Sequence, residues 1–400
     1  HRIPGPVASP AEDLVGPPAI LTERRGVLKG WPLSLVIASF LLTILGTFMT
    51  RSGIFNSVHA FSQSDIGPTI LAFLGIATLA SVLLLGFRVD LLKPDNELDR
   101  GASRDTAFLA QNLLFVLFTF TVLIGTVFPL IVEAVRKVQM SVGRPYFDRM
   151  TIPIGALLLF VMGVGPALPW GSSTREELKR RLLPPMGLGF AVLAAALAYG
   201  IRTPWTLITL FFAGYTAWVT LFEALRPVRT RMKFRTDGFL KAFAQDLFGP
   251  GRRRMAAYVT HAGAVAAFIA IAVSSTSGRS LEQTLKQGES MTLGRYSLTF
   301  EGIERAEEPN RTSVIARIGV KKDGKDLGPL RPMMNQYMTN REAIGTPAVR
   351  TGLVEDLYLS AMNIDEETGT VGLLVLINPL VSWLWIATVI MAIGGLMALF

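Results

Sequence analysis

Long uncharged stretches, separated by short charged segments, dominate the pattern of apolar and polar positions along the chain. A helix needs roughly 20 mainly apolar residues to cross about 30 Å of hydrocarbon. Eight stretches come near or exceed this length: residues 30–50, 66–87, 106–132, 150–174, 182–201, 203–222, 255–278 and 368–400. The pattern predicts a polytopic α-helical membrane protein with about eight transmembrane helices.

One polar region interrupts this pattern, over residues 279–367, where 12 basic and 14 acidic residues are mixed. Its apolar residues alternate with others, as in strands with one buried face, at Tyr296, Leu298 and Phe300 and again at Val314, Ala316, Ile318 and Val320. Asp323-Gly324 is typical of a tight hairpin turn. We therefore expect a mainly β domain, a small barrel or sandwich, inserted before the last helix.

The remaining boundaries follow from these two patterns. Residues 1–29 are expected to be an irregular cytoplasmic segment, and residues 30–278 to hold the first seven helices with an external loop at 50–65. Residues 368–400 would hold a final strand and the eighth helix. The stretches 182–201 and 203–222 predict a helical hairpin with a tight outer turn near Thr203-Pro204.

Composition excludes several other classes of protein. Half of the chain is hydrophobic and 17% is charged, against roughly 25% charged residues in soluble domains. The chain has no cysteine, so it can form no disulfide, cysteine-ligated metal site or thiol nucleophile. A soluble enzyme, a disordered chain and a secreted disulfide scaffold are all inconsistent with these numbers.

The distribution of positive charge predicts the orientation in the membrane. The connecting segments 1–29, 88–105, 175–181 and 226–254 hold 21 Lys and Arg, whereas 51–65, 133–149 and position 202 hold six. Cytoplasmic segments carry the excess of Lys and Arg, so the first set is predicted inside and residues 279–367 outside. The densest basic stretch, Arg226 to Arg254, then indicates contact with anionic lipid headgroups, with a specific partner as the alternative, and the distribution of the net charge of +9 argues against nucleic acid.

His261 is the first candidate functional residue. It lies seven residues after Arg254, which places it about 10 Å along a helix at ~1.5 Å per residue. Ionisable side chains at such a depth usually face a partner or a cavity. A neutral imidazole bonded to a neighbouring helix and an axial ligand of haem iron are equally compatible with the pattern. Gly263 permits the close approach of either another helix or a flat cofactor.

The second candidate is the loop at residues 50–62. It combines a cation, Arg51, with the apolar residues Phe55, Val58 and Phe61 and with His59. The apolar residues could bind a flat ligand, Arg51 a carboxylate and His59 a metal. A snorkelling arginine and a solvated histidine explain the same residues, so the loop alone is a weak signal.

The segment Leu45 to Gly53, followed by Ser57-Val58-His59-Ala60-Phe61, resembles the CcmF family of haem-handling membrane proteins in cytochrome c maturation. Further family segments occur in the same order: Leu21 to Arg25, Gly165-Pro166, Thr260-His261, Asp356-Leu357-Tyr358, and Asn378 to Val381 followed by Trp383 and Trp385. The resemblance covers roughly residues 20–400.

This resemblance implies a haem lyase subunit in the bacterial inner membrane. In the family, haem from the external chaperone CcmE is joined to the CxxCH thiols of apocytochrome c, which the subunit CcmH handles. The resemblance makes His59 an axial ligand of the transferred haem, with Arg51, Phe55 and Phe61 as haem contacts. It makes His261 an axial ligand of a resident haem b. It identifies no catalytic residue.

Two departures accompany the resemblance. The family's Trp-rich haem-binding segment is not found in this chain, and the position of its other membrane histidine, six residues before Glu23, is Pro17. We therefore expect the chain to be the C-terminal part of a longer protein that supplies one ligand to each haem. The alternative function is a transporter with an external binding domain, His261 as a proton relay and the loop 50–62 as a gate.

Overall fold

The computed structural model describes residues 30–52, 66–93, 101–138, 140–169, 174–235, 238–338 and 343–399. Residues 1–186 and 187–398 form two compact units, which are described separately. Among the described residues, eight helices are long and apolar enough to cross a membrane, and each overlaps one predicted stretch. The prediction of a polytopic helical membrane protein is confirmed.

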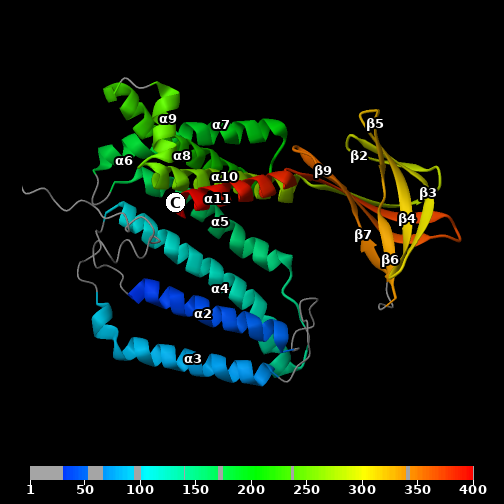
Figure 1. The fold of residues 1–400 in the computed structure, drawn as a ribbon, viewed down its shortest axis with the longest axis horizontal. Coiled ribbons are helices and arrows are strands. Elements are labelled where there is room, and N and C mark those ends of the chain that lie inside the picture. Colours follow the sequence, from blue (N-terminus) through cyan, green and yellow to red (C-terminus); the bar gives the residue numbers. More distant parts are fainter. Residues whose placement is uncertain are drawn as a thin grey trace, which may run out of the picture. The chain divides into compact units, whose positions relative to one another are not determined.

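The first unit consists of helices (Figure 1), some of which pack through small residues. A Cβ on Gly67 of α3 would lie 3.0 Å from the Cβ of Ser52, and one on Gly125 of α4 would lie 2.7 Å from the Tyr146 and Phe147 rings of α5. Such close contacts are typical of helix association in lipid. The elements are α2 (Gly30–Arg51), α3 (Gly67–Phe87), the 3₁₀ turn η2 (Val89–Leu92), α4 (Arg104–Arg136), α5 (Arg144–Ala167) and α6 (Arg175–Leu182).

The second unit contains five helices and the β domain. The predicted hairpin is confirmed: α7 (Pro184–Tyr199) and α8 (Pro204–Arg235) are joined by four residues, and Arg202 donates to the carbonyl oxygens of Leu197 and Ile201. The other helices are α9 (Phe239–Phe248), α10 (Arg252–Ser277) and α11 (Val381–Leu399).

The basic segment 226–254 is more ordered than a connecting segment. Helix α8 continues through it to Arg235, and α9 follows. Arg, Lys and Met are good helix formers, so the helix does not end where the apolar residues end. The charge pattern located the polar segment but carried no information on its conformation.

The β domain is a sandwich of two antiparallel sheets inserted between α10 and α11, as Figure 1 shows. One sheet has the order β1-β10-β9-β8, and the other has β2-β3-β4-β6-β7 with β5 paired to β4. The strands are β1 (Arg279–Lys286), β2 (Ser290–Leu293), β3 (Tyr296–Glu308), β4 (Arg311–Lys322), β5 (Lys325–Leu330), β6 (Met333–Tyr337), β7 (Ile344–Thr346), β8 (Ala348–Arg350), β9 (Glu355–Asp365) and β10 (Thr370–Pro379).

The alternation in sequence matches the burial in this sandwich except at Val314, which is half-buried while its neighbour Ser313 is buried. Tyr296, Leu298 and Phe300 are buried in the core, and Ala316, Ile318 and Val320 are buried from the adjacent strand. The predicted hairpin is confirmed, since Asp323 and Gly324 both have positive φ and connect Lys322 to its partner Lys325. Positive φ at both central residues is the requirement of a type I′ turn.

Candidate functional site

The predicted site residues fall in three different parts of the chain. His261 lies in α10, in the second unit, and Arg51 is the last residue of α2, in the first. His59, Phe55 and Phe61 lie outside the described residues. The structure therefore describes the surroundings of His261 and leaves the external haem-binding loop as a prediction.

Helix α10 begins at a cluster of charge and continues into an apolar, alanine-rich segment. Arg252, Arg253 and Arg254 form its first turn, and eight of its 26 residues are alanine. At its charged end, Arg254 Nη2 and Arg231 Nη2 of α8 lie 3.8 and 3.1 Å from Oδ1 of the buried Asp246 of α9. At its other end, the Thr206 hydroxyl of α8 donates to that of Thr276. These contacts hold α8 and α10 side by side and antiparallel, with His261 between the two ends.

The imidazole of His261 has a buried nitrogen without a partner. Its Nδ1 is enclosed and makes no hydrogen bond, although the residue as a whole is only half-buried. The ring of Tyr258, one turn earlier, meets it edge-on with the ring centroids 6.5 Å apart. A buried polar atom in a protein is usually hydrogen-bonded, so this unpaired nitrogen marks the position as unusual.

The helix face around His261 carries two small and two larger residues. Positions three and four residues away lie on the same face of a helix, and here they are Ala257, Tyr258, Ala264 and Val265. Ala257 is exposed, Ala264 is half-buried and Val265 is buried. The two alanines leave room for a flat apolar ligand on one part of this face, and the Tyr258 ring lies against the imidazole on another.

Gly263 belongs to a different face of α10, which packs against α11. A Cβ at this position would lie 2.6 Å from Met391 Cγ and 2.8 Å from the carbonyl oxygen of Ala387. The structure thus decides between the two explanations of Gly263: it permits the approach of a helix. The case for a cofactor rests on His261, Ala257 and Ala264.

These residues fit one axial position of a haem iron. A neutral imidazole on an apolar face is a common haem ligand, and the unpaired Nδ1 is consistent with a ring not already used in hydrogen bonding between helices. His261 is the only histidine among the described residues, and within them no group of three or more His, Cys, Asp or Glu could hold a metal ion. The site offers one ligand, not a complete pair.

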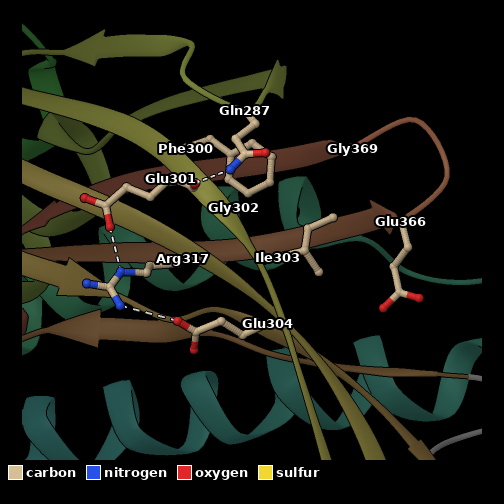
Figure 2. Close-up of a pocket in the computed structure, with 9 residues that line it drawn as sticks. All are labelled: Gln287, Phe300, Glu301, Gly302, Ile303, Glu304, Arg317, Glu366 and Gly369. Atoms are coloured by element: carbon tan, nitrogen blue, oxygen red, sulfur yellow. Dashed lines mark hydrogen bonds and ion pairs between the residues drawn. The ribbon is translucent and has the colours of Figure 1, made fainter.

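Sequence reasoning did not find a second feature, a polar hollow of about 410 Å³ on the β domain (Figure 2). Arg317 of β4 donates to Glu301 at 2.7 Å and to Glu304 at 3.4 Å, and Gln287 Nε2 donates to the carbonyl oxygen of Glu301. These hydrogen bonds to the two carboxylates raise the pKa of Arg317. Strand pairing alone brings these residues together, so no motif could have revealed the hollow.

The hollow is unsuited to haem. The residues described around it include no histidine, methionine or cysteine, and its two central carboxylates are already paired with Arg317. The remaining lining residues are Phe300, Gly302, Ile303, Glu366 and Gly369. Its arrangement stabilises the sheet surface and carries no iron ligand.

Comparison with known proteins gives a consistent family assignment. Residues 278–379 match the model of the CcmF C-terminal beta-sandwich. The chain is 32% identical over 379 residues to the cytochrome c-type biogenesis protein CcmF of Pseudomonas aeruginosa and 30% identical over 388 residues to that of Escherichia coli. These alignments cover 94% and 95% of this chain and 56% of each relative.

A solved structure has the same fold. The cytochrome c heme lyase CcmF superposes with a TM-score of 0.74 and 28% sequence identity, covering 98% of this chain and 57% of that one. The chain therefore spans somewhat more than half the length of the relatives it matches. Since these likenesses extend over both the helices and the sandwich, the chain belongs to the CcmF family.

Proposed function

We propose that this chain forms part of a haem lyase subunit of cytochrome c maturation in the bacterial inner membrane. In this role it attaches haem to the CxxCH thiols of apocytochrome c. The observation that carries the proposal is the His261 imidazole, whose buried Nδ1 has no hydrogen-bond partner, beside Ala257 and Ala264 on α10. The printed names of the relatives, a cytochrome c-type biogenesis protein and a heme lyase, support the same reaction.

His261 is proposed as one axial ligand of a resident haem b. Its Nε2 would bind the iron, and Ala257 and Ala264 would leave room for the ring plane beside the helix. The bound group would supply an electron that keeps the substrate haem reduced. The chain's own contribution is to hold the imidazole at a fixed depth, between the Asp246 ion pairs and the Thr206–Thr276 hydrogen bond.

The substrate haem is proposed to bind at the external loop. His59 would ligate its iron, Phe55 and Phe61 would contact the porphyrin plane, and Arg51 would pair with a propionate. The haem chaperone CcmE would deliver the substrate, and CcmH would present the thiols. The iron ligand would hold the centre of the ring in place, and the pairing of Arg51 with a propionate would select the edge that faces the thiols.

The transporter alternative has less support. It uses the same buried histidine as a proton relay, but the named relatives act in cytochrome c biogenesis. The two functions differ in a simple measurement, because a haem lyase with a resident haem has a low-spin Soret band and a transporter has none.

The test compares two histidine variants of the whole protein, purified from membranes. His261→Ala should lose the b-type haem spectrum while inserting normally, because the iron loses an axial ligand. Tyr258→Phe, the control, keeps the neighbouring ring and should retain the spectrum. His59→Ala should keep the resident haem and abolish cytochrome c assembly, with partial rescue by added imidazole. An unchanged haem content in His261→Ala would contradict the assignment of His261, and full cytochrome assembly by His59→Ala would contradict that of His59.

A further inference from the structure

The β domain and the last helix are joined by a single residue. Strand β10 ends at Pro379 and α11 begins at Val381. Leu380, between them, has a positive φ of 59°, a conformation that is uncommon for a residue other than glycine. The chain therefore turns sharply, and the base of the sandwich lies directly against the first turn of α11.

The loop between β8 and β9 is hydrogen-bonded to this junction. The backbone N–H of Leu380 donates to the carbonyl oxygen of Val354 at 2.9 Å, and the indole Nε1–H of Trp383 donates to that of Leu353, also at 2.9 Å. The buried carboxylate of Asp356 accepts from the Gly352 N–H at 2.9 Å and from the Ser382 hydroxyl at 3.3 Å. Three of these hydrogen bonds join residues 353–356 to the start of the helix, and the fourth, between Gly352 and Asp356, closes the loop on itself.

This well-supported loop presents two aliphatic side chains outward. Leu353 is 65% exposed and Val354 69% exposed, while their carbonyl groups bond to the helix. Trp385, on the first turns of α11, is 74% exposed. Adjacent exposed apolar side chains on a rigid support are typical of an interaction surface.

The length of α11 indicates what this surface contacts. Its 19 residues span about 28 Å at ~1.5 Å per residue, close to the roughly 30 Å of bilayer hydrocarbon. None of its residues is charged, and the last strand of the polar sandwich ends at Pro379, two residues before it begins, so its first turn must lie at the edge of the hydrocarbon. Tryptophans are enriched at this boundary, and the loop bonded to Trp383 lies at the same level.

We propose that Leu353 and Val354 insert into the interfacial layer of the bilayer beside Trp383 and Trp385, and so hold the β domain against the membrane surface. The occupant of this surface is lipid: the upper acyl chains and glycerol region of one leaflet. The proposal is independent of haem binding and of the lyase reaction. Its consequence is that the domain has a fixed orientation relative to the membrane, instead of swinging on Leu380.

The absence of cysteine from the chain makes a site-specific test direct. Leu353→Cys and Val354→Cys are each labelled with a fluorophore in the full chain, reconstituted in lipid nanodiscs. Both substitutions leave the backbone carbonyl acceptors in place, so each label should report on the native loop, and one variant suffices if the other fails to fold. Met362→Cys is the control: Met362 is a 52% exposed residue of β9, about 23 Å from Glu355 at ~3.3 Å per residue.

Lipids that carry a nitroxide on the upper acyl chain should quench the labels at 353 and 354 several-fold more than the label at 362. A water-soluble quencher should show the opposite order. Equal quenching by the aqueous reagent at all three positions would overturn the proposal, because the loop would then face water. Protection from both quenchers at 353 and 354 would also overturn it, because protein and not lipid would cover the loop.

Discussion

At the scale of single residues, the position of each side chain around the axis of α10 separates two roles, packing against α11 and the proposed ligand binding by His261. Gly263 and Thr260 lie on the face that meets α11, and His261 lies between them in sequence. Consecutive helical positions are about 100° apart, so residues close in sequence can serve packing and ligand binding without interfering. The sequence showed a histidine two residues before a glycine, but only the structure showed that the glycine packs against α11.

The two adjacent glycines of α11 provide a matched test of this packing. A Cβ on Gly394 would lie 2.8 Å from the Thr260 backbone N and 2.9 Å from the Ala256 carbonyl oxygen, whereas Gly395 has no atom within 4 Å. We expect Gly394→Ala to destabilise the protein by about 1–3 kcal/mol, as overpacking usually does. Gly395→Ala should be neutral or slightly stabilising. Thermal unfolding in detergent measures both, and equal midpoints would show that α10 and α11 do not pack this closely.

At the scale of elements, short polar contacts place the helices and turns. Helix α9 contributes Asp246, 1% exposed, which lies between Arg231 of α8 and Arg254 of α10. In the sandwich, Arg295 of the β2–β3 turn pairs with Asp323 of the β4–β5 turn. Each carboxylate joins the ends of separate elements, and apolar packing along the elements does not by itself fix those ends.

Removal of the α9 carboxylate should weaken the helix junction. Asp246→Ala leaves two guanidinium groups without their partner, and we expect a loss of about 1–3 kcal/mol, since both arginines remain partly hydrated. The control Gln245→Ala removes only the neutral hydrogen bond from Arg231 and should cost less. Thermal unfolding of the two variants compares them, and an unchanged midpoint for Asp246→Ala would contradict the role of the ion pairs.

The turn in the sandwich should give a pH-dependent stability. The hydrogen bond from Arg295 lowers the pKa of Asp323 below its ordinary value of 3.8. A lowered pKa in the folded state contributes stability above the unfolded value, and this contribution disappears as the pH falls through the folded value. Asp323→Asn, which tolerates positive φ, should therefore lose part of the dependence of the thermal midpoint on pH below 3.8.

The control for this effect is Glu367→Gln, which removes a carboxylate from a different turn and should leave the dependence of the wild type largely unchanged. The same acid dependence in the Asp323→Asn variant as in the wild type would show that the Arg295 contact contributes nothing to folding.

At the scale of the whole molecule, the predicted orientation depends on charge alone. The segment 226–254 carries nine Lys and Arg, and the sandwich is separated from it by the single spanning helix α10. The two must therefore lie on opposite sides of the membrane. The excess of positive charge favours the inside for 226–254.

Reporter fusions test this orientation. A reporter that works only outside the cytoplasm should be active at the Asp323-Gly324 turn and inactive at residues 236–237. A reporter that works only in the cytoplasm should show the opposite pattern. Results contrary to both expectations would reverse the orientation of every helix, and with it the proposed external position of His59.

The sequence by itself determined the class of the protein and most of its elements. The eight apolar stretches, the alternating segment and the Asp-Gly turn are local patterns. Each reflects only what surrounds its own side chains, which is lipid for the helices and the sandwich core for the strands. For the same reason His261 could be identified as a candidate, because an ionisable group within an apolar stretch is visible without a fold.

Only the tertiary structure decided which residues meet. The Asp246 ion pairs, the Arg317 cluster and the Asp356 junction join residues from separate elements, and no local pattern specifies those partners. The same holds for Leu353 and Val354, which no sequence pattern singles out and which we place at the membrane edge only because their carbonyl groups accept hydrogen bonds from Trp383 of α11 and from Leu380 just before it. Contacts between distant segments depend on how whole elements pack, and the pattern of apolar and polar positions within each element leaves that packing open.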